Sequence, residues 1–125
     1  MYRILLADDE GIMLESLKKI IETEYGNECE IHTAKTGRVV VEEAEKYPPD
    51  ICFMDIQMPV MDGYQAAEAI RAVKRIDAKT IPVLALTANA FATDIGKAHS
   101  AGMNDHVAKP IEVERLIETL QKWLG

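Results

Sequence analysis

Several classes of protein are excluded by what this chain of 125 residues has little of. Its two cysteines, Cys29 and Cys52, lie in separate apolar segments without metal-site spacing, which predicts buried thiols rather than a disulfide or a zinc site. No apolar run approaches the roughly 20 residues of a membrane-spanning helix. Residues 1–4 lead directly into an apolar segment and leave no room for a signal peptide, which predicts a cytoplasmic location.

Positive charge is scarce as well. The chain has 14 Lys and Arg residues against 21 Asp and Glu residues, a formal net charge of −7 and a pI near 4.9. Nucleic-acid binding and attraction to anionic lipid both need clustered Lys and Arg, and the sequence has no such cluster. It also has no Ser-His-Asp or Cys-His arrangement and no glycine-rich phosphate loop. We therefore expect no direct contact with nucleic acid or membrane.

What the sequence does have is a regular alternation of apolar segments. Strands are predicted near residues 2–7, 29–34, 51–55, 82–86 and 106–108. A helix follows each strand, built on Met13, Leu17, Ile20 and Ile21; Val40, Val41 and Ala44; Ala66, Ala67, Ile70 and Val73; Phe91, Ile95 and Ala98; and Val113, Leu116, Ile117, Leu120 and Leu124. Alternation of this kind predicts one α/β domain over residues 1–125, with a doubly wound parallel sheet covered by helices on both faces.

Turn and cap residues place the helix ends. Gly26 and Asn27 are predicted to end the first helix, and Thr36 to cap the second. Pro48 and Pro49 stop the second helix. Asp62 and Gly63 are predicted to open the third helix, and Gly102 to close the fourth. The polar stretch 75–80 is predicted to be a loop.

Polar residues stand where four of these strands end. Asp8 and Asp9 follow the first strand, Asp55 ends the third, Thr87 follows the fourth and Lys109 follows the fifth. In an open α/β sheet, ligands bind outside the carboxyl ends of the strands, so these side chains are expected to share one crevice. Three carboxylates held close together repel one another unless a cation is present, and oxygen ligands without His or Cys favour Mg²⁺, with Mn²⁺ as a substitute.

The same groups suit a bound phosphoryl group. A carboxylate is an acceptable nucleophile for phosphorus and gives an acyl phosphate, while a lysine and a hydroxyl neutralise the charge of the transferred group. Each residue also has a simpler interpretation. Asp8 and Asp9 suit an acidic first helical turn, Thr87 and Asp55 suit caps or turns, and Lys109 suits the surface. Because these residues occur together at four strand ends, the interpretation as one functional site is favoured over the separate structural roles.

These residues carry a resemblance to the receiver domain of two-component response regulators. The acidic residues 8–10, the stretch Phe53-Met54-Asp55-Ile56-Gln57-Met58-Pro59-Val60-Met61-Asp62-Gly63, the segment 85–88 and the segment 107–110 are similar to the four signatures of that family. The resemblance covers the whole chain and implies a five-stranded sheet of order 2-1-3-4-5, similar to flavodoxin. It also implies a signalling domain rather than an enzyme.

The resemblance assigns a role to each site residue. Asp55 would accept a phosphoryl group from a histidine of a sensor kinase or a histidine phosphotransfer domain. Asp9, Asp55 and the backbone carbonyl of Gln57 would bind Mg²⁺, and Asp8 would reach the metal through water. Lys109 would pair with a phosphoryl oxygen, and its bond to Pro110 would be cis. Thr87 would swing inward to bind the phosphoryl group and so act as the switch.

Two further assignments concern regulation. His106 stands where the family often has Tyr or Phe, the aromatic residue that turns inward on activation, so this turn is hypothesised to depend on pH. The hypothesis fails if phosphorylation-driven changes are identical at about pH 6 and about pH 8. A surface histidine without function is the alternative. Gln57 and Asn89 would flank the path of the hydrolytic water and tune the lifetime of the phosphoryl group.

Other functions fit the residues less well. A phosphatase of the haloacid-dehalogenase type needs a second Asp two residues after the nucleophile, and Gln57 occupies that place. A flavin mononucleotide binder needs a phosphate loop after the first strand, where Asp8 and Asp9 would repel phosphate. A receiver-shaped binding module that is never phosphorylated is opposed by the intact set of Asp55, Thr87 and Lys109.

The output of the domain is left open. The chain resembles receivers of hybrid sensor kinases in its second half and receivers of transcriptional regulators in its first third, so it is either a stand-alone protein or a piece of a longer one. The face made by the fourth helix, fifth strand and last helix is the family's usual surface for a homodimer or a target. Here that face would include Phe91, Ile95, His99, His106 and Glu112.

Overall fold

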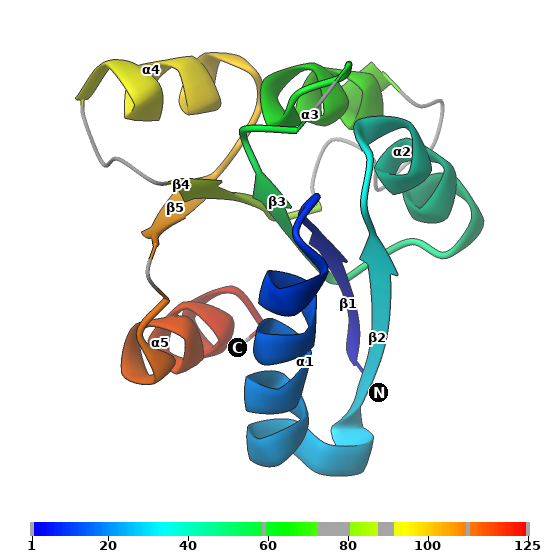
Figure 1. Ribbon diagram of the computed structural model, residues 1–125, viewed down its shortest axis with the longest axis vertical. Helices are drawn as coiled ribbons and strands as arrows, with labels where there is room; N and C mark the ends of the chain where they lie inside the picture. Colours follow the sequence, from blue (N-terminus) through cyan, green and yellow to red (C-terminus); the bar gives the residue numbers. More distant parts are fainter. Residues whose placement is uncertain (1, 59, 73–80, 88–91, 110, 125) are drawn as a thin grey trace.

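The computed structural model in Figure 1 describes residues 2–58, 60–72, 81–87, 92–109 and 111–124. Five parallel strands form one sheet: β1 (Tyr2–Ala7), β2 (Cys29–Ala34), β3 (Ile51–Asp55), β4 (Val83–Thr87) and β5 (Asp105–Ala108). Their order across the sheet is β2-β1-β3-β4-β5, so the predicted doubly wound α/β fold and strand order are confirmed.

Helices cover both faces of this sheet. They are α1 (Gly11–Tyr25), α2 (Gly37–Lys46), α3 (Gly63–Ala72), α4 (Ala92–Ser100) and α5 (Val113–Leu124), and a short 3-10 turn, η1 (Gly26–Glu28), follows α1. One hydrophobic cluster joins the sheet to α1 and α5, and a second joins it to α2, α3 and α4. Figure 1 shows the same division, with α1 and α5 on one side of the strands.

Burial of the strands follows from this cover. All five residues of β3 and all five of β4 are buried, which explains their unbroken apolar runs. Strand β2 lies at the edge and is only partly buried, as its alternating sequence predicts. Cys52 is buried in β3 as expected, whereas Cys29 at the start of β2 is only half-buried because the edge strand lacks a neighbour on one side.

Local chemistry accounts for the helix ends. Gly26 adopts φ 54°, a conformation that glycine accepts readily, and its backbone N–H donates to the carbonyl of Glu22 as α1 ends. The Val39 N–H donates to Thr36 Oγ1 at 3.2 Å, so the predicted cap of α2 is confirmed. Asp62 and Gln65 cap α3 reciprocally, with backbone-to-side-chain distances of 2.9 and 3.0 Å.

The structure also corrects details of the pattern. The buried stripe of α1 is Leu14, Leu17 and Ile21, whereas Met13 and Ile20 are only partly buried at its margins. Val113, expected among the apolar residues of the last helix, is exposed in the first turn of α5. The predicted inner residue Val73 and the predicted loop 75–80 lie outside the described residues. In the described part of the chain, no helix has both the length and the apolar character needed to cross a membrane.

Candidate functional site

The carboxyl ends of three strands meet around one ammonium group. Asp8 follows β1, Asp55 ends β3 and Lys109 follows β5. Lys109 Nζ donates to Asp8 Oδ2 at 2.9 Å and to Asp55 Oδ2 at 3.1 Å. Asp8 is 0% exposed and Asp55 is 5% exposed, so both carboxylates are held largely away from water. The sheet therefore brings together residues that are 47 and 54 positions apart.

The second oxygen of each carboxylate is held by the backbone. The N–H of Glu10 donates to Asp8 Oδ1 at 2.9 Å, and the N–H of Gln57 donates to Asp55 Oδ1 at 2.9 Å. Each bond runs from a residue two positions further along, which is the turn that aspartate favours at a strand end. Every carboxylate oxygen of the pair thus has a donor, and the orientation of both side chains is determined before any ligand binds.

Burial dominates the electrostatics of Asp55. Loss of water raises the pKa of Asp55, and the nearby charge of Asp8 raises it further, while the hydrogen bonds from Gln57 and Lys109 act in the opposite direction. Burial alone would lower the pKa of Lys109, but its hydrogen bonds to Asp8 and Asp55 outweigh this effect and raise it. Lys109 therefore stays charged at neutral pH, and the site carries excess negative charge.

Thr87 lies at the end of β4, between the strand that ends in Asp55 and the strand that precedes Lys109. Its side chain is already 0% exposed, before any inward movement. Thr87 Oγ1 is buried and has no hydrogen-bond partner within the described residues. Since a buried hydroxyl without a partner costs on the order of 1–3 kcal/mol, this atom is poised for an acceptor that a ligand would bring.

Oxygen ligands for a cation gather at the same edge. One carboxylate oxygen each from Asp8, Asp9 and Glu10 lie within 4.8 Å of one another, and Asp9 and Glu10 are exposed. The predicted ligands Asp8 and Asp9 are thus close together, and Glu10, which was not predicted as a ligand, joins them. Asp55 is joined to this group through Lys109, which both Asp8 and Asp55 bind. A donor set made only of oxygen fits a hard cation such as Mg²⁺ or Mn²⁺.

The residues predicted to act in regulation lie further out. His106 in β5 is half-buried, and its Nδ1 lies 3.8 Å from Asp105 Oδ1. It borders two hollows of 230 and 340 Å³ on the face made by α4, β5 and α5. Gln57 is exposed beside Asp55. Asn89, Phe91 and Pro110 lie outside the described residues, as does the side chain of Ile95, so the predicted cis bond at Lys109 stays a prediction.

Two residues close to Asp55 in the chain have backbone features that the sequence analysis did not identify. A Cβ atom on Gly63 would lie 2.5 Å from the carbonyl oxygen of Asp55, so only glycine allows α3 to start against the end of β3. Val60 has φ 69°, a conformation rare for a β-branched residue, and is fully exposed in the loop that follows Asp55. Gly63 directly follows the stretch that contains Asp55, and a glycine at that place could have indicated that the helix start lies close to the strand end. Nothing in the sequence indicates the positive φ of Val60.

Comparison with known proteins gives a consistent result. The family model described as the response regulator receiver domain matches residues 4–121. The chain is 35% identical over 124 residues to the sensor protein GacS of Pseudomonas syringae pv. syringae, covering 98% of this chain and 13% of that protein. It is 36% identical over 120 residues to the signal transduction histidine-protein kinase BarA of Escherichia coli (strain K12), covering 96% of this chain and 12% of that protein.

Two solved structures extend the comparison. The receiver domain of the sensor histidine kinase PA1611 from Pseudomonas aeruginosa PAO1, with a magnesium ion coordinated in its active site cleft, superposes with a TM-score of 0.87 at 33% identity, covering 99% of this chain and 98% of that one. The chemotaxis protein CheY4 of Vibrio cholerae superposes with a TM-score of 0.89 at 28% identity, covering 98% of each chain. The chain spans only about an eighth of the length of GacS and of BarA.

Proposed function

The chain belongs to the family of response regulator receiver domains, and on that premise we propose that it carries a phosphorelay signal by accepting a phosphoryl group on Asp55. The family is a signalling domain rather than a classical enzyme. The observation that carries the proposal is the binding of one ammonium, Lys109 Nζ, to two buried carboxylates beside a hydroxyl without a partner. That set supplies a nucleophile, a counter-charge and a free donor.

In the proposed transfer, the protein forms a single covalent bond and otherwise positions the reacting groups and neutralises their charge. A carboxylate oxygen of Asp55 forms a bond to phosphorus as the bond from phosphorus to a histidine nitrogen of the donor breaks, and the histidine leaves as the neutral ring after taking up a proton. Lys109 then pairs with one phosphoryl oxygen. The Thr87 hydroxyl, which has no partner within the described residues, donates a hydrogen bond to another phosphoryl oxygen. This hydrogen bond removes the cost of burying the Thr87 hydroxyl without a partner, and we propose that its formation is the switching step.

A divalent cation completes the site. Asp8, Asp9, Asp55 and the carbonyl of Gln57 are the residues that would hold Mg²⁺ or Mn²⁺, and the carboxylate of Glu10 lies within the same group. The ion would neutralise the phosphoryl oxygens during transfer. The magnesium found in the receiver of the similar kinase PA1611 supports this assignment. Gln57, with Asn89, would set how long the phosphoryl group survives.

Partners follow from the same premise. We propose a sensor histidine kinase or a histidine phosphotransfer domain as the donor, in the cytoplasm, and a single receiver domain over residues 1–125. The likeness to GacS and BarA favours a receiver of a hybrid kinase. Through movement of His106, the face of α4, β5 and α5 would bind a target or a second copy, and exposed His99 and Glu112 lie on it.

The test uses a small phosphodonor in place of the kinase. Incubation with acetyl phosphate and Mg²⁺ is expected to add one labile phosphoryl group, seen by intact-protein mass spectrometry, and EDTA is expected to abolish the gain. Asp55→Asn should show no gain, whereas Asp50→Asn, on the surface at the opposite edge of the sheet, should behave as the wild type. A wild-type protein that gains nothing would instead be a receiver-shaped binding module.

A further inference from the structure

The edge strand β2 offers an unpaired backbone. It pairs with β1 on one side only, because it is the last strand of the described sheet. The carbonyl of Ala34 points toward β1, since it accepts the N–H of Asp8 at 3.1 Å. Backbone groups alternate along a strand, so those of Cys29, Ile31 and Thr33 point outward. The Cys29 N–H still closes the last turn of η1, whereas the outward N–H and C=O groups of Ile31 and Thr33 have no hydrogen-bond partner within the described part of the chain.

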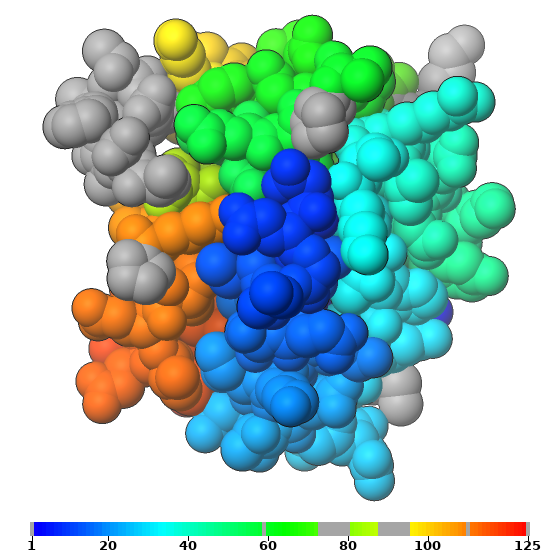
Figure 2. Space-filling model, in the orientation of Figure 1, coloured from blue at the N-terminus to red at the C-terminus, as the bar shows by residue number. Residues whose placement is uncertain are grey.

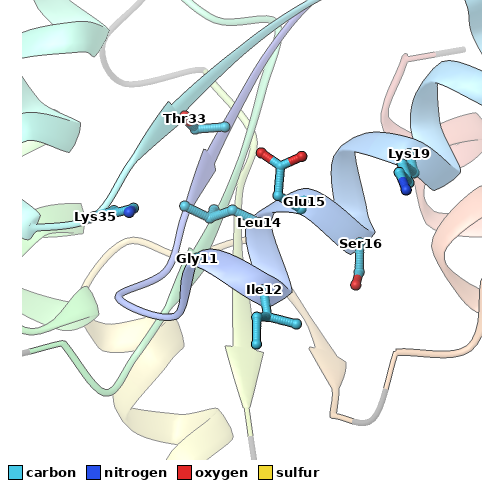
Figure 3. Close-up of a pocket in the computed structure, with 8 residues that line it drawn as sticks. All are labelled: Gly11, Ile12, Leu14, Glu15, Ser16, Lys19, Thr33 and Lys35. Atoms are coloured by element: carbon cyan, nitrogen blue, oxygen red, sulfur yellow. The ribbon is translucent and has the colours of Figure 1, made fainter.

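A groove follows the same strand. One hollow of 620 Å³ lies between Thr33 and Lys35 of the β2 segment and the first turns of α1, where Figure 3 shows Leu14 and Glu15 across from them. A second hollow of 600 Å³ is lined by Cys29 and Ile31 and by the end of α1. Figure 2 shows this side of the molecule, with α1 in blue beside the cyan β2 segment.

The two hollows share one stripe of α1. Gly11 and Glu15 line the first, Lys18 and Glu22 line the second, and their spacing of four, three and four residues places them along one side of a helix. On the strand, the lining residues alternate, so they share one face of β2. We call this surface the β2 groove. It runs the length of an open strand edge, which is the geometry that an added strand requires.

The charge of the β2 groove indicates what would bind there. Lys18 pairs with Glu22 at 3.9 Å, whereas Lys19 and Lys35 have no ion pair among the described residues. Among the charged residues that line this hollow, Lys19 and Lys35 outnumber the one acid, Glu15. We propose that the β2 groove binds an extended acidic segment of a partner protein as a sixth strand, with its carboxylates toward Lys19 and Lys35.

A second copy of this chain fits the groove less well. It would present its own Cys29, Ile31 and Thr33 on this face, and none of these carries a negative charge to meet the lysines. The proposal does not depend on phosphoryl transfer, because no residue of the Asp55 site lines the groove.

The experiment titrates the protein with a short capped peptide that alternates valine and glutamate, followed by NMR. We expect shifts in the amides of Ile31 and Thr33 and slower hydrogen exchange at both. A peptide with lysine in place of glutamate should bind at least about tenfold more weakly, and so should a peptide whose alternate backbone amides are methylated.

Variants of the groove separate the backbone from the charge. Thr33→Pro removes an outward N–H without removing a bond to β1 and should lower affinity. Lys35→Glu and Lys19→Glu, both on the surface, should do the same, whereas Lys46→Glu in the last turn of α2 should not. Equal binding of the lysine peptide, shifts that map elsewhere, or a dimer in sedimentation that Thr33→Pro disrupts would each overturn the proposal.

Discussion

At the scale of single residues, the site holds more negative charge than its one lysine can balance. Asp8 and Asp55 are both buried, both bind Lys109 and both direct an oxygen at a backbone N–H. Burial of an ionised carboxylate opposes folding unless its partners compensate fully, and burial raises the pKa of Asp55 despite the hydrogen bonds from Gln57 and Lys109. Asp55, which we propose as the phosphoacceptor, is therefore retained at the expense of stability, as is common at functional sites.

This imbalance predicts that Asp55→Asn stabilises the metal-free protein. A folded-state pKa above the unfolded value of 3.8 means that the folded protein binds the proton more tightly, so ionised Asp55 lowers stability at neutral pH. The amide removes that cost, and the free energy of unfolding should rise by on the order of 1 kcal/mol. The gain should shrink as the pH falls through the raised pKa, because the wild-type carboxyl then becomes neutral.

Urea unfolding of both proteins in EDTA, from about pH 7 down to about pH 4, measures this difference. Glu118→Gln removes an exposed charge on α5 and serves as the control, with no expected change. An Asp55→Asn protein that is less stable than the wild type at neutral pH would contradict the electrostatic account.

Val60 provides a second residue-scale prediction. Its φ of 69° is unfavourable for a β-branched side chain, and its full exposure means that no packing compensates. Asparagine accepts this conformation, so Val60→Asn should raise the free energy of unfolding by roughly 1 kcal/mol, measured by denaturant titration. Val60→Ile keeps the branch and should give no gain; an equal gain from isoleucine would rule out backbone strain as the cause.

At the scale of elements, the site depends on how closely α3 approaches β3. Gly63 opens α3 directly against the backbone of Asp55 and Ile56, and its N–H donates to the carbonyl of Ile56 at 3.2 Å. Gly37 makes a similar approach at the start of α2, where a Cβ would lie 2.5 Å from the carbonyl oxygen of Met61. The loop after Asp55 is thus held between the first turns of two helices.

Alanine at two glycines tests this arrangement. Gly63→Ala should cost roughly 1–3 kcal/mol of stability, because the added methyl overlaps the Asp55 carbonyl, and should slow phosphorylation by acetyl phosphate. Gly96→Ala is the matched control, since a Cβ there meets nothing within 4 Å and helix propensity favours alanine in α4. It should raise the melting temperature and leave phosphorylation unchanged; similar effects at both glycines would argue against a specific approach at Gly63.

These elements also show how far sequence reasoning reaches. The unbroken apolar runs predict β3 and β4, and the cap at Thr36 and the stop at Gly26 are local signals that the structure confirms. The close approach of Gly63 and the φ of Val60 depend on how helices pack against the strand, which no local pattern encodes. The same holds for Arg71, whose guanidinium donates to the Gly102 carbonyl at 2.7 Å and ties α3 to the segment before β5.

At the scale of the whole molecule, parallel topology is what assembles the site. Every described strand runs in the same direction, so all carboxyl ends lie at one edge, and residues from distant parts of the chain meet there. The strand-end argument could therefore predict Asp8, Asp55 and Lys109 as neighbours without any distance information. It could not predict that Thr87 is already buried, because that depends on side-chain packing around the end of β4.

A divalent cation bound at the carboxyl edge of the sheet should stabilise the whole domain. If Asp8, Asp9 and Asp55 hold Mg²⁺ only in the folded state, the ion should raise the melting temperature, by an amount equivalent to about 2.7 kcal/mol at 100 times its Kd. Calorimetry in MgCl2 and in NaCl of equal ionic strength distinguishes binding from screening. Asp9→Asn should lose most of the effect, and an equal response to NaCl would show that no specific site exists.

Locating the phosphoryl group tests the central claim most directly. Protein treated with acetyl phosphate and Mg²⁺ is reduced with borohydride, which converts an aspartyl phosphate to homoserine, and the modified position is then read by peptide mass spectrometry. Modification at Asp55 alone, absent in EDTA and strongly reduced in Lys109→Met, is the predicted result. Modification at Asp8 or Asp9 instead, or of Asp55 to the same extent without a divalent cation, would contradict the account.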